Sequence, residues 1–188
     1  FRKLTQSTFI NLWKRDLIYI ANRPNNYCYD CGTTIADAEI AYQEIPTKLV
    51  YMKFGIKETG TIIVASTRPE LLFACQAIIV NPEDERYSGL VGKYAILPLF
   101  HRQVEILAHR TANPSFGSGA VMVCSYGDRN DVQLFRELGL KEIVSLTEYG
   151  TTTEMAESYA KLRISQARSR IIEDLRNCLL YTSDAADD

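Results

Sequence analysis

The segment at positions 47–66, TKLVYMKFGIKETGTIIVAS, decides the fold of this chain. Residues 47–56 and 60–66 are rich in β-branched and aromatic side chains, which favour extended strands. The polar residues Lys57, Glu58 and Thr59, followed by Gly60, have the composition of a hairpin loop. The segment therefore predicts two neighbouring strands joined by a short turn.

Strand-like runs continue along the chain after this hairpin. They lie at 77–80, 94–99, 103–108 and 120–124, and turn-forming residues separate them at 81–84 and 113–119. Six short strands with connections of varied length predict a closed or nearly closed barrel rather than a doubly wound sheet. Amphipathic helices are expected after the barrel, at 132–138 and 164–175. The predicted fold class is therefore α+β, with a barrel-like domain at 47–177 flanked by helices.

The first 46 residues have a different organisation. Apolar residues spaced three and four apart predict a helix over 5–19, and the polar run 22–26, which contains Pro24, ends it. Cys28 and Cys31 follow in a Cys-x-x-Cys knuckle, and a polar connector extends through Pro46. We therefore expect residues 1–46 to form a helix and a connector that precede the barrel domain.

The segment 178–188, CLLYTSDAADD, breaks off a helical pattern without a cap. It resembles the conceptual translation of a transposase adapter used in preparing sequencing libraries, and a natural acidic tail is the alternative. We treat it as adapter-derived, expect it not to pack against the domain, and leave it out of the fold and function. Together with Phe rather than Met at position 1, it suggests an internal piece of a larger reading frame.

The composition is that of an ordinary globular protein. The 188 residues carry a formal net charge of −2, with 46% hydrophobic and 23% charged residues. That balance argues against non-specific nucleic-acid binding by a basic surface. No apolar run approaches the roughly 20 residues needed to span a bilayer, so we expect no membrane partner. Five cysteines at wide spacing, without a secretory signal, predict a reducing compartment, and we expect the cytoplasm.

Several motifs could carry chemistry. They are Ser66-Thr67-Arg68-Pro69-Glu70, Phe116-Gly117-Ser118-Gly119, Gly127-Asp128-Arg129-Asn130-Asp131 and the segment 81–87, NPEDERY. Together they closely resemble the inserted editing domain of class I aminoacyl-tRNA synthetases. The sequence Pro-Glu-Asp-Glu-Arg-Tyr and the Cys-x-x-Cys knuckle resemble the valyl enzymes. The stretch Cys124-Ser125-Tyr126-Gly127-Asp128 resembles the archaeal type of these enzymes rather than the bacterial type. The resemblance covers 1–177 and implies a β-barrel editing domain, with 1–46 coming from its junction with the catalytic domain.

The residue types in these motifs fit a mischarged aminoacyl-tRNA end, which offers an ammonium, an ester, a ribose diol and a phosphate. Asp131 can pair with the ammonium, and Arg68 can bind the phosphate in a bidentate manner. Thr67 and Ser66 can hold the ester or an attacking water. Both histidines of the chain lie in the strand region away from the motifs. We therefore expect hydrolysis by a positioned water rather than through a covalent intermediate.

Each candidate also has a purely structural interpretation. Asp128 and Asp131 stand where acids cap a helix. The resemblance implies that Asp131 binds the ammonium, whereas capping and catalysis stay equally open for Asp128. Gly117 and Gly119 would let the backbone approach a substrate closely, which a Cβ would obstruct. The resemblance further implies that Phe116 lies near the terminal adenosine.

The motifs depart from the bacterial valyl pattern at several positions. Gly127 replaces a histidine, and Leu71 replaces a threonine. Met122 and Cys124 replace the lysine and threonine that help to read the threonine hydroxyl. The ammonium and phosphate anchors are retained, and Glu70 completes the substrate-binding set that we expect.

Cys28 and Cys31 provide half of a zinc knuckle. Tetrahedral zinc requires four ligands, and the sequence offers no second Cys-x-x-Cys or His pair. In the family the partner pair, where present, follows the editing domain. We therefore expect two free thiols here, and zinc only if a second ligand pair lies outside this chain.

The resemblance implies a second, hydrolytic sieve. A valine pocket cannot strongly reject the near-isostere threonine, and the known discrimination of valyl enzymes is only on the order of 100-fold. We expect this domain to hydrolyse Thr-tRNA(Val), contacting the 3′ end of tRNA(Val) and its attached threonine or valine, as a monomer and without a cofactor. The parent enzyme would ligate valine to tRNA(Val) with ATP and Mg²⁺ at a site outside this chain. The alternatives are the editing domain of an isoleucyl or leucyl enzyme, and a non-catalytic RNA-binding or zinc-ribbon module.

Overall fold

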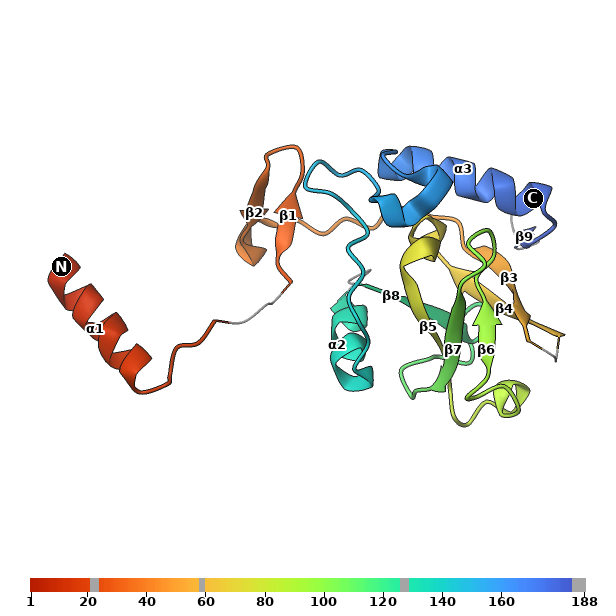
Figure 1. Cartoon of the computed structure of the whole chain (residues 1–188), viewed down its shortest axis with the longest axis horizontal. Helices are drawn as coiled ribbons and strands as arrows, with labels where there is room; N and C mark the ends of the chain where they lie inside the picture. The colour runs from red at the N-terminus through yellow and green to blue at the C-terminus, as the bar shows by residue number, and fades with distance from the viewer. Residues whose placement is uncertain (21–23, 58–59, 126–128, 184–188) are drawn as a thin grey trace.

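A computed structural model of the chain describes residues 1–20, 24–57, 60–125 and 129–183 (Figure 1). Its main body is a sheet in the order β4-β3-β6-β7-β5-β8. The strands are β3 (Val50–Ile56), β4 (Gly60–Ser66), β5 (Cys75–Val80), β6 (Tyr94–Ile96), β7 (Gln103–Ala108) and β8 (Ala120–Cys124). The end strands β4 and β8 lie next to each other. The sheet is therefore a nearly closed barrel, and the expected α+β class is confirmed.

The hairpin that opens the barrel forms as the sequence predicts. β3 and β4 pair antiparallel from Val50 opposite Ser66 to Ile56 opposite Gly60. Along β3, Val50, Ile56 and the residues that alternate between them are buried, whereas Lys53 is exposed. Because side chains alternate between the faces of a strand, this register puts one apolar row into the barrel core. β5 pairs parallel to β7, and the other neighbouring strands of the sheet are antiparallel.

Helices cover the barrel on two sides. α2 (Arg129–Leu138) packs against β5 and β8 through Leu134 and Phe135, which contact Ile79 and Val123. α3 (Ile164–Asn177) lies across the barrel beside the short helices η2 (Pro69–Ala74) and η4 (Glu154–Tyr159), as Figure 1 shows. Its buried residues are Ala167, Ile171 and Leu175. Both helices therefore turn an apolar face to the core, as their amphipathic patterns predict.

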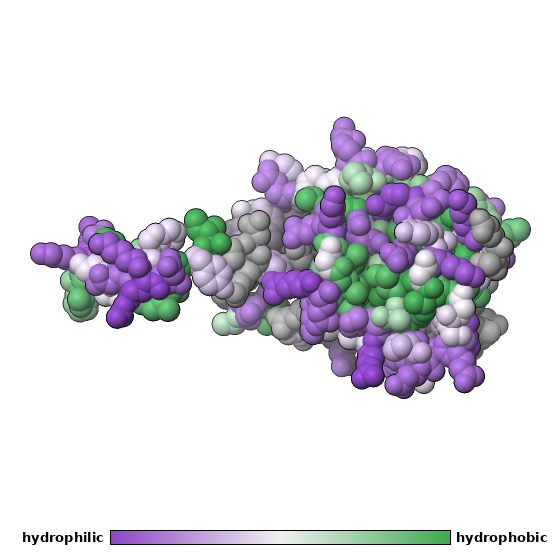
Figure 2. All heavy atoms as spheres, turned by 60° about the horizontal axis from the view of Figure 1, so that its bottom comes forward, coloured by the Kyte–Doolittle hydropathy of each residue, from purple (hydrophilic) through white to green (hydrophobic). Residues whose placement is uncertain are grey.

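The first part of the chain projects away from the barrel (Figure 1). α1 (Arg2–Lys14) has no buried residue, and Figure 2 shows both hydrophobic and hydrophilic side chains on its surface. The helix was expected over 5–19 and is shorter at its end, because Asp16 adopts a positive φ of 55° that breaks the helical path. Neither α1 nor another helix of the described residues is long and apolar enough to cross a membrane.

A small hairpin follows, formed by β1 (Asn26–Cys28) and β2 (Thr33–Ile35), with the one-turn helix η1 (Asp37–Glu39) after it. The ring of Tyr29 lies against the backbone of Gly150, where an added Cβ would come within 2.7 Å of the ring. Gly150 also has a φ of +69°. This contact connects the hairpin to the loop that precedes η4.

The tail contacts the barrel, which differs from the expectation for 178–188. β9 (Tyr181–Ser183) pairs antiparallel with the start of β3, and Leu180 packs, half-buried, against the core. β6 pairs with β3 only at Gly55 and Ile56. The first half of that edge therefore offers unpaired backbone groups to any extended segment, whatever its side chains. The origin of 178–188 stays a prediction.

Candidate active site

A pocket of about 260 Å³ opens where the end of β4, β8 and the first turn of α2 meet. Its polar lining consists of Ser66, Thr67, Arg68 and Asp131, and Phe116 contributes an aromatic side chain. The sequence analysis predicted all five of these residues as site residues, and they come from three separate segments of the chain. The apolar lining consists of Ala65, Leu71, Val121, Met122 and Cys124. The structure thus brings both expected anchors, Arg68 and Asp131, to one pocket.

The chain leaves β4 in a turn that presents Thr67 and Arg68 to this pocket. The backbone N–H of Arg68 donates to Ser66 Oγ over 3.0 Å. Pro69 follows as the first residue of η2 and disfavours a helical conformation at Arg68, whose φ is −126° and ψ 62°. The Ser66 oxygen is therefore an acceptor for the backbone, while its O–H can still donate a hydrogen bond.

Glu70 lies behind the pocket rather than in its lining. The residue is only 5% exposed. Its Oε1 accepts a hydrogen bond from Arg68 Nε over 3.3 Å, and its Oε2 accepts one from Arg168 Nη1 over 2.8 Å. Glu70 was expected to bind substrate, and the structure places it outside the pocket lining, in contact with Arg68 and Arg168. Arg168 was not nominated, because no spacing rule connects residues 98 positions apart.

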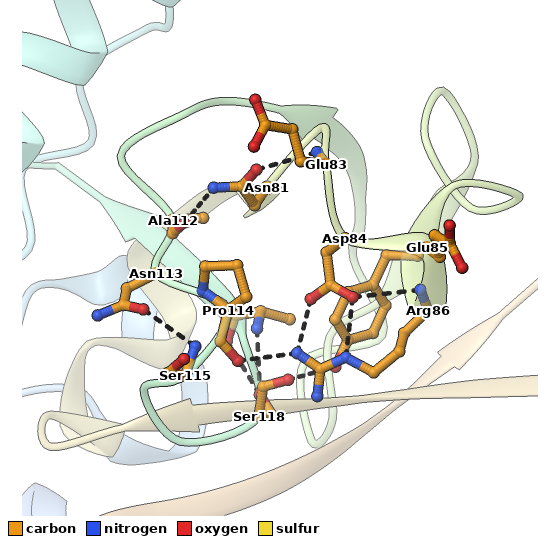
Figure 3. Close-up of polar contacts among 12 residues, drawn as sticks. Asn81, Glu83, Asp84, Glu85, Arg86, Ala112, Asn113, Pro114, Ser115 and Ser118 are labelled. Atoms are coloured by element: carbon orange, nitrogen blue, oxygen red, sulfur yellow. Dashed lines mark hydrogen bonds and ion pairs between the residues drawn. The ribbon is translucent and has the colours of Figure 1, made fainter.

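The loop that carries Phe116 is clamped by the NPEDERY segment (Figure 3). The guanidinium of Arg86 forms a bidentate pair with Asp84, with Nε–Oδ1 at 2.8 Å and Nη2–Oδ2 at 2.6 Å. This pair holds the pKa of the Asp84 carboxyl below its usual value. Arg86 Nη2 also donates to the carbonyl of Pro114 over 2.8 Å. Asp84 is the N-cap of the one-turn helix η3 (Glu85–Tyr87), and its side chain also accepts from the backbone N–H of Arg86 over 3.2 Å, so the pair is a fixed anchor for the loop.

The same clamp reaches the second half of the loop. The hydroxyl of Tyr87 donates to the carbonyl of Ser118 over 2.5 Å. Gly119 has a φ of +81°, and a Cβ there would lie 2.6 Å from Arg86 Nη2. Gly117 has a φ of +56°, and a Cβ there would lie 2.6 Å from that of Ala65. The protein's own atoms thus require glycine at both positions, and close approach of a substrate there stays a prediction.

α2 brings Asp131 to the pocket in its first turn, where the helix macrodipole favours the ionised carboxylate. Asp128, the other nominated acid of this motif, lies outside the described residues, as does Gly127. The far end of α2 is tied to the barrel through Glu137, which contacts His109 Nε2 at 3.1 Å and accepts from Gln133 at 2.6 Å. These two bonds hold the pKa of the Glu137 carboxyl below its ordinary value.

The pocket combines charged and hydroxyl side chains with an apolar lining. Arg68 and Asp131 supply opposite charges, and Thr67 and Ser66 supply hydroxyls. Cys124 is the thiol in the lining, and its pKa is raised well above the ordinary value by a hydrogen bond with Cys75 and by burial. It is therefore a poor nucleophile. No histidine occurs among the described residues that line the pocket, and attack by a positioned water stays a prediction.

The Cys-x-x-Cys turn supplies two thiols and no further ligand. The backbone N–H of Cys31 donates to Cys28 Sγ over 3.4 Å, and the backbone hydrogen bond lowers the pKa of the Cys28 thiol. Within the described residues, no group of three or more His, Cys, Asp or Glu side chains is placed to hold a metal. Two thiolates do not complete the four-ligand shell of a structural zinc.

Comparisons with known proteins agree with this description. No family model matches the chain. The valine–tRNA ligase of Nanoarchaeum equitans is 51% identical over 177 residues, which are 94% of this chain and 23% of that protein. The enzyme of Aeropyrum pernix is 48% identical over 93% of this chain and 21% of its own length. The leucyl-tRNA synthetase of Agrobacterium radiobacter K84, solved as a ternary complex, superposes with a TM-score of 0.58 at 20% identity, covering 73% of this chain and 20% of that one.

These matches identify the chain as part of an aminoacyl-tRNA synthetase, and the leucyl structure shares its fold. At 40–51% identity to several archaeal enzymes, the chain belongs to the valine–tRNA ligase family, in its archaeal type. It spans about a fifth of the length of the curated relatives that it matches.

Proposed function

We propose that this segment of the synthetase hydrolyses threonine from mischarged tRNA(Val) at the pocket between β4, β8 and α2. The convergence of Arg68 and Asp131 on one pocket with the hydroxyls of Thr67 and Ser66 is the observation that supports this proposal. A guanidinium suits the 3′-terminal phosphate and a carboxylate suits the α-ammonium of the attached amino acid. The name of the leucyl complex, which contains tRNA, supports tRNA as the partner.

Hydrolysis adds a water oxygen to the ester carbonyl carbon and breaks the bond to the ribose oxygen, which recovers its proton. The products are free threonine and uncharged tRNA. In this proposal, Asp131 binds the α-ammonium of the amino acid and Arg68 binds the terminal phosphate of the tRNA. The ester is held between these two groups, and the Thr67 hydroxyl orients the water or the ester carbonyl. Holding the ester and the water in a reactive geometry lowers the entropic part of the activation barrier. Neither a metal nor a covalent intermediate takes part in this step.

The proposal extends to the parent enzyme. Ligation of valine to tRNA(Val), with ATP and Mg²⁺, takes place outside this segment. The enzyme acts in the cytoplasm as a monomer and contacts tRNA(Val) with either threonine or valine attached. The identity of 51% to a valine–tRNA ligase favours this function over the editing of isoleucyl or leucyl products.

Deacylation assays with the full-length parent enzyme test this function. We expect rapid release of threonine from Thr-tRNA(Val), while Val-tRNA(Val) and Ile-tRNA(Ile) stay charged. The same assay is applied to Arg68→Ala. We expect this substitution to raise the KM for Thr-tRNA(Val) more than it lowers kcat, because the phosphate is bound in both the ground state and the transition state. Hydrolysis of Val-tRNA(Val) at the same rate as Thr-tRNA(Val) would contradict the proposed specificity.

A further inference from the structure

Arg168 reaches from α3 to the motif that forms one wall of the pocket. Its Nη1 donates to the carbonyl oxygen of Thr67 over 2.5 Å and to Glu70 Oε2 over 2.8 Å. Its Nη2 lies 3.5 Å from Thr47 Oγ1. One side chain of α3 thus contacts a backbone carbonyl and a carboxylate of the motif, as well as the residue that starts the segment leading into β3.

The carboxylate of Glu70 is shared between two arginines. Its side chain is 6% exposed, whereas the side chains of Arg68 and Arg168 are 42% and 26% exposed. A buried carboxylate needs a countercharge and hydrogen bonds to stay ionised. Arg168 provides the shorter and less exposed contact of the two. Arg68, the more exposed partner, is the one that lines the pocket.

α3 is firmly seated, so a side chain that it carries is well placed. Ala167, on one side of Arg168, is fully buried, as are Ile171 and Leu175. The hydroxyl of Tyr159 donates to Asp174 Oδ2 over 2.6 Å, which joins the helix to η4. The packing of α3 on the core therefore fixes the backbone from which Arg168 extends, and the contacts to Thr67 and Glu70 hold its Nη1.

We propose that Arg168 is a positioning residue for the pocket, which holds the Thr67 carbonyl directly and orients the Arg68 guanidinium through Glu70. This inference rests on the proposed function, in which Arg68 binds the terminal phosphate. Without Arg168, the buried Glu70 carboxylate depends on Arg68 for its countercharge and draws that guanidinium away from the substrate. Loss of Arg168 therefore weakens substrate binding although Arg168 does not line the pocket.

The test compares Arg168→Gln with Arg163→Gln in the full-length parent enzyme. Arg163 is the exposed N-cap residue of α3, so both variants remove one positive charge from the same helix. We expect Arg168→Gln to raise the KM for Thr-tRNA(Val) by about tenfold with a smaller change in kcat, the order of effect of one hydrogen bond to a charged group. We expect Arg163→Gln to change KM by less than about twofold, as is usual for an exposed charge.

Arg168→Lys provides a rescue. Lysine keeps the positive charge that balances Glu70, although its Nζ lies one bond nearer the backbone than the Nη1 that contacts Thr67 and Glu70. We expect this variant to recover part of the lost affinity. Equal KM values for Arg168→Gln and Arg163→Gln would overturn the proposal, since the effect would then be one of overall charge.

A spectroscopic measurement separates positioning from hydrolysis. In ¹⁵N spectra of the 188-residue chain, the Nε–H signal of Arg68 should shift in Arg168→Gln and return toward its original position in Arg168→Lys. Melting curves of the same variants show whether each is folded at the temperature of measurement. An unshifted Arg68 signal in a folded Arg168→Gln variant overturns the positioning role. A shifted signal in a chain whose parent enzyme does not hydrolyse Thr-tRNA(Val) contradicts the proposed function alone.

Discussion

At the scale of single residues, Asp131 has two roles that local sequence cannot separate. It lies in the first turn of α2, where an acid stabilises the helix. It also lines the pocket together with Arg68, which carries the opposite charge. The capping interpretation and the binding interpretation are both compatible with this position. They differ in what a substitution does to hydrolysis by the folded enzyme.

Asp131→Ala in the full-length parent enzyme is therefore expected to slow deacylation of Thr-tRNA(Val) by at least about tenfold. A charge-assisted hydrogen bond to the ammonium is worth about 1.5–3 kcal/mol, and about 1.4 kcal/mol is a factor of ten in rate. Valine activation should be unchanged. If deacylation per folded molecule stays at the original rate while the melting temperature falls, Asp131 is only a helix cap.

The cysteines are expected to differ in their pH dependence. The Cys31 backbone N–H lowers the pKa of Cys28, the Cys28 hydrogen bond raises that of Cys31, and the hydrogen bond with Cys75 and burial raise that of Cys124. Only the thiolate reacts with iodoacetamide. As the pH rises, Cys28 should therefore be alkylated before Cys31, and Cys124 should react only after unfolding. Peptide mass spectrometry across a pH series checks this order, and simultaneous labelling of Cys28 and Cys31 would contradict it.

At the scale of elements, the chain shows what sequence patterns can and cannot predict. The strands of the barrel were predicted closely, because their apolar residues are buried in the core, in alternation along β3 and β7 and almost throughout β5 and β8. For example, 60–66 and 103–108 match β4 and β7 residue for residue. The extent of α1 was wrong, because none of its residues is buried and its end depends on the local backbone at Asp16. The spacing of apolar residues therefore predicts the bounds of an element well where those residues are buried in a core.

The candidate site was predicted only in part for a related reason. Motif residues could be nominated from their chemistry, but their supports lie far away in the sequence. Arg168 contacts Thr67 across 101 positions, and Tyr87 contacts Ser118 across 31. The burial of Glu70 is likewise decided by the helix that packs over it. Such tertiary contacts have no signature in local spacing.

The clamp on the Phe116 loop leads to a prediction about two glycines that have the same φ. Gly119 and Gly92 both have a φ of +81°, but only Gly119 has neighbours where a Cβ would go, the nearest being Arg86 Nη2 at 2.6 Å. Gly92→Ala should therefore cost only the conformational strain, about 1 kcal/mol. Gly119→Ala should cost about 1–3 kcal/mol more, because the Asp84–Arg86 pair must shift.

Thermal or denaturant unfolding of the two alanine variants measures this difference. Deacylation should fall only for Gly119→Ala, since its loop carries Phe116 into the pocket. Equal destabilisation by the two substitutions would show that the clamp does not constrain the loop.

At the scale of the whole molecule, the tail provides a test of what the barrel needs to be stable. β9 pairs with the start of β3 on the edge away from β4, and the backbone N–H of Lys53 donates to the carbonyl of Leu180 over 2.9 Å. The pocket lies on the β4 side of this strand. Removal of 178–188 should therefore leave the pocket intact, while it exposes an edge of β3 and the part of the core that Leu180 covers.

We expect a chain that ends at Asn177 to lose about 1–3 kcal/mol of its free energy of unfolding. The loss comes from a few edge hydrogen bonds, each worth about 1 kcal/mol net, and from the half-buried Leu180 side chain. In hydrogen-exchange measurements, the Lys53 amide should lose its protection, while the Val64 amide on the buried neighbouring strand should keep it. If Lys53 is equally protected with and without the tail, β9 does not pair in solution. In that case residues 178–188 do not contribute to the stability of the barrel, which is what the sequence of that segment predicts.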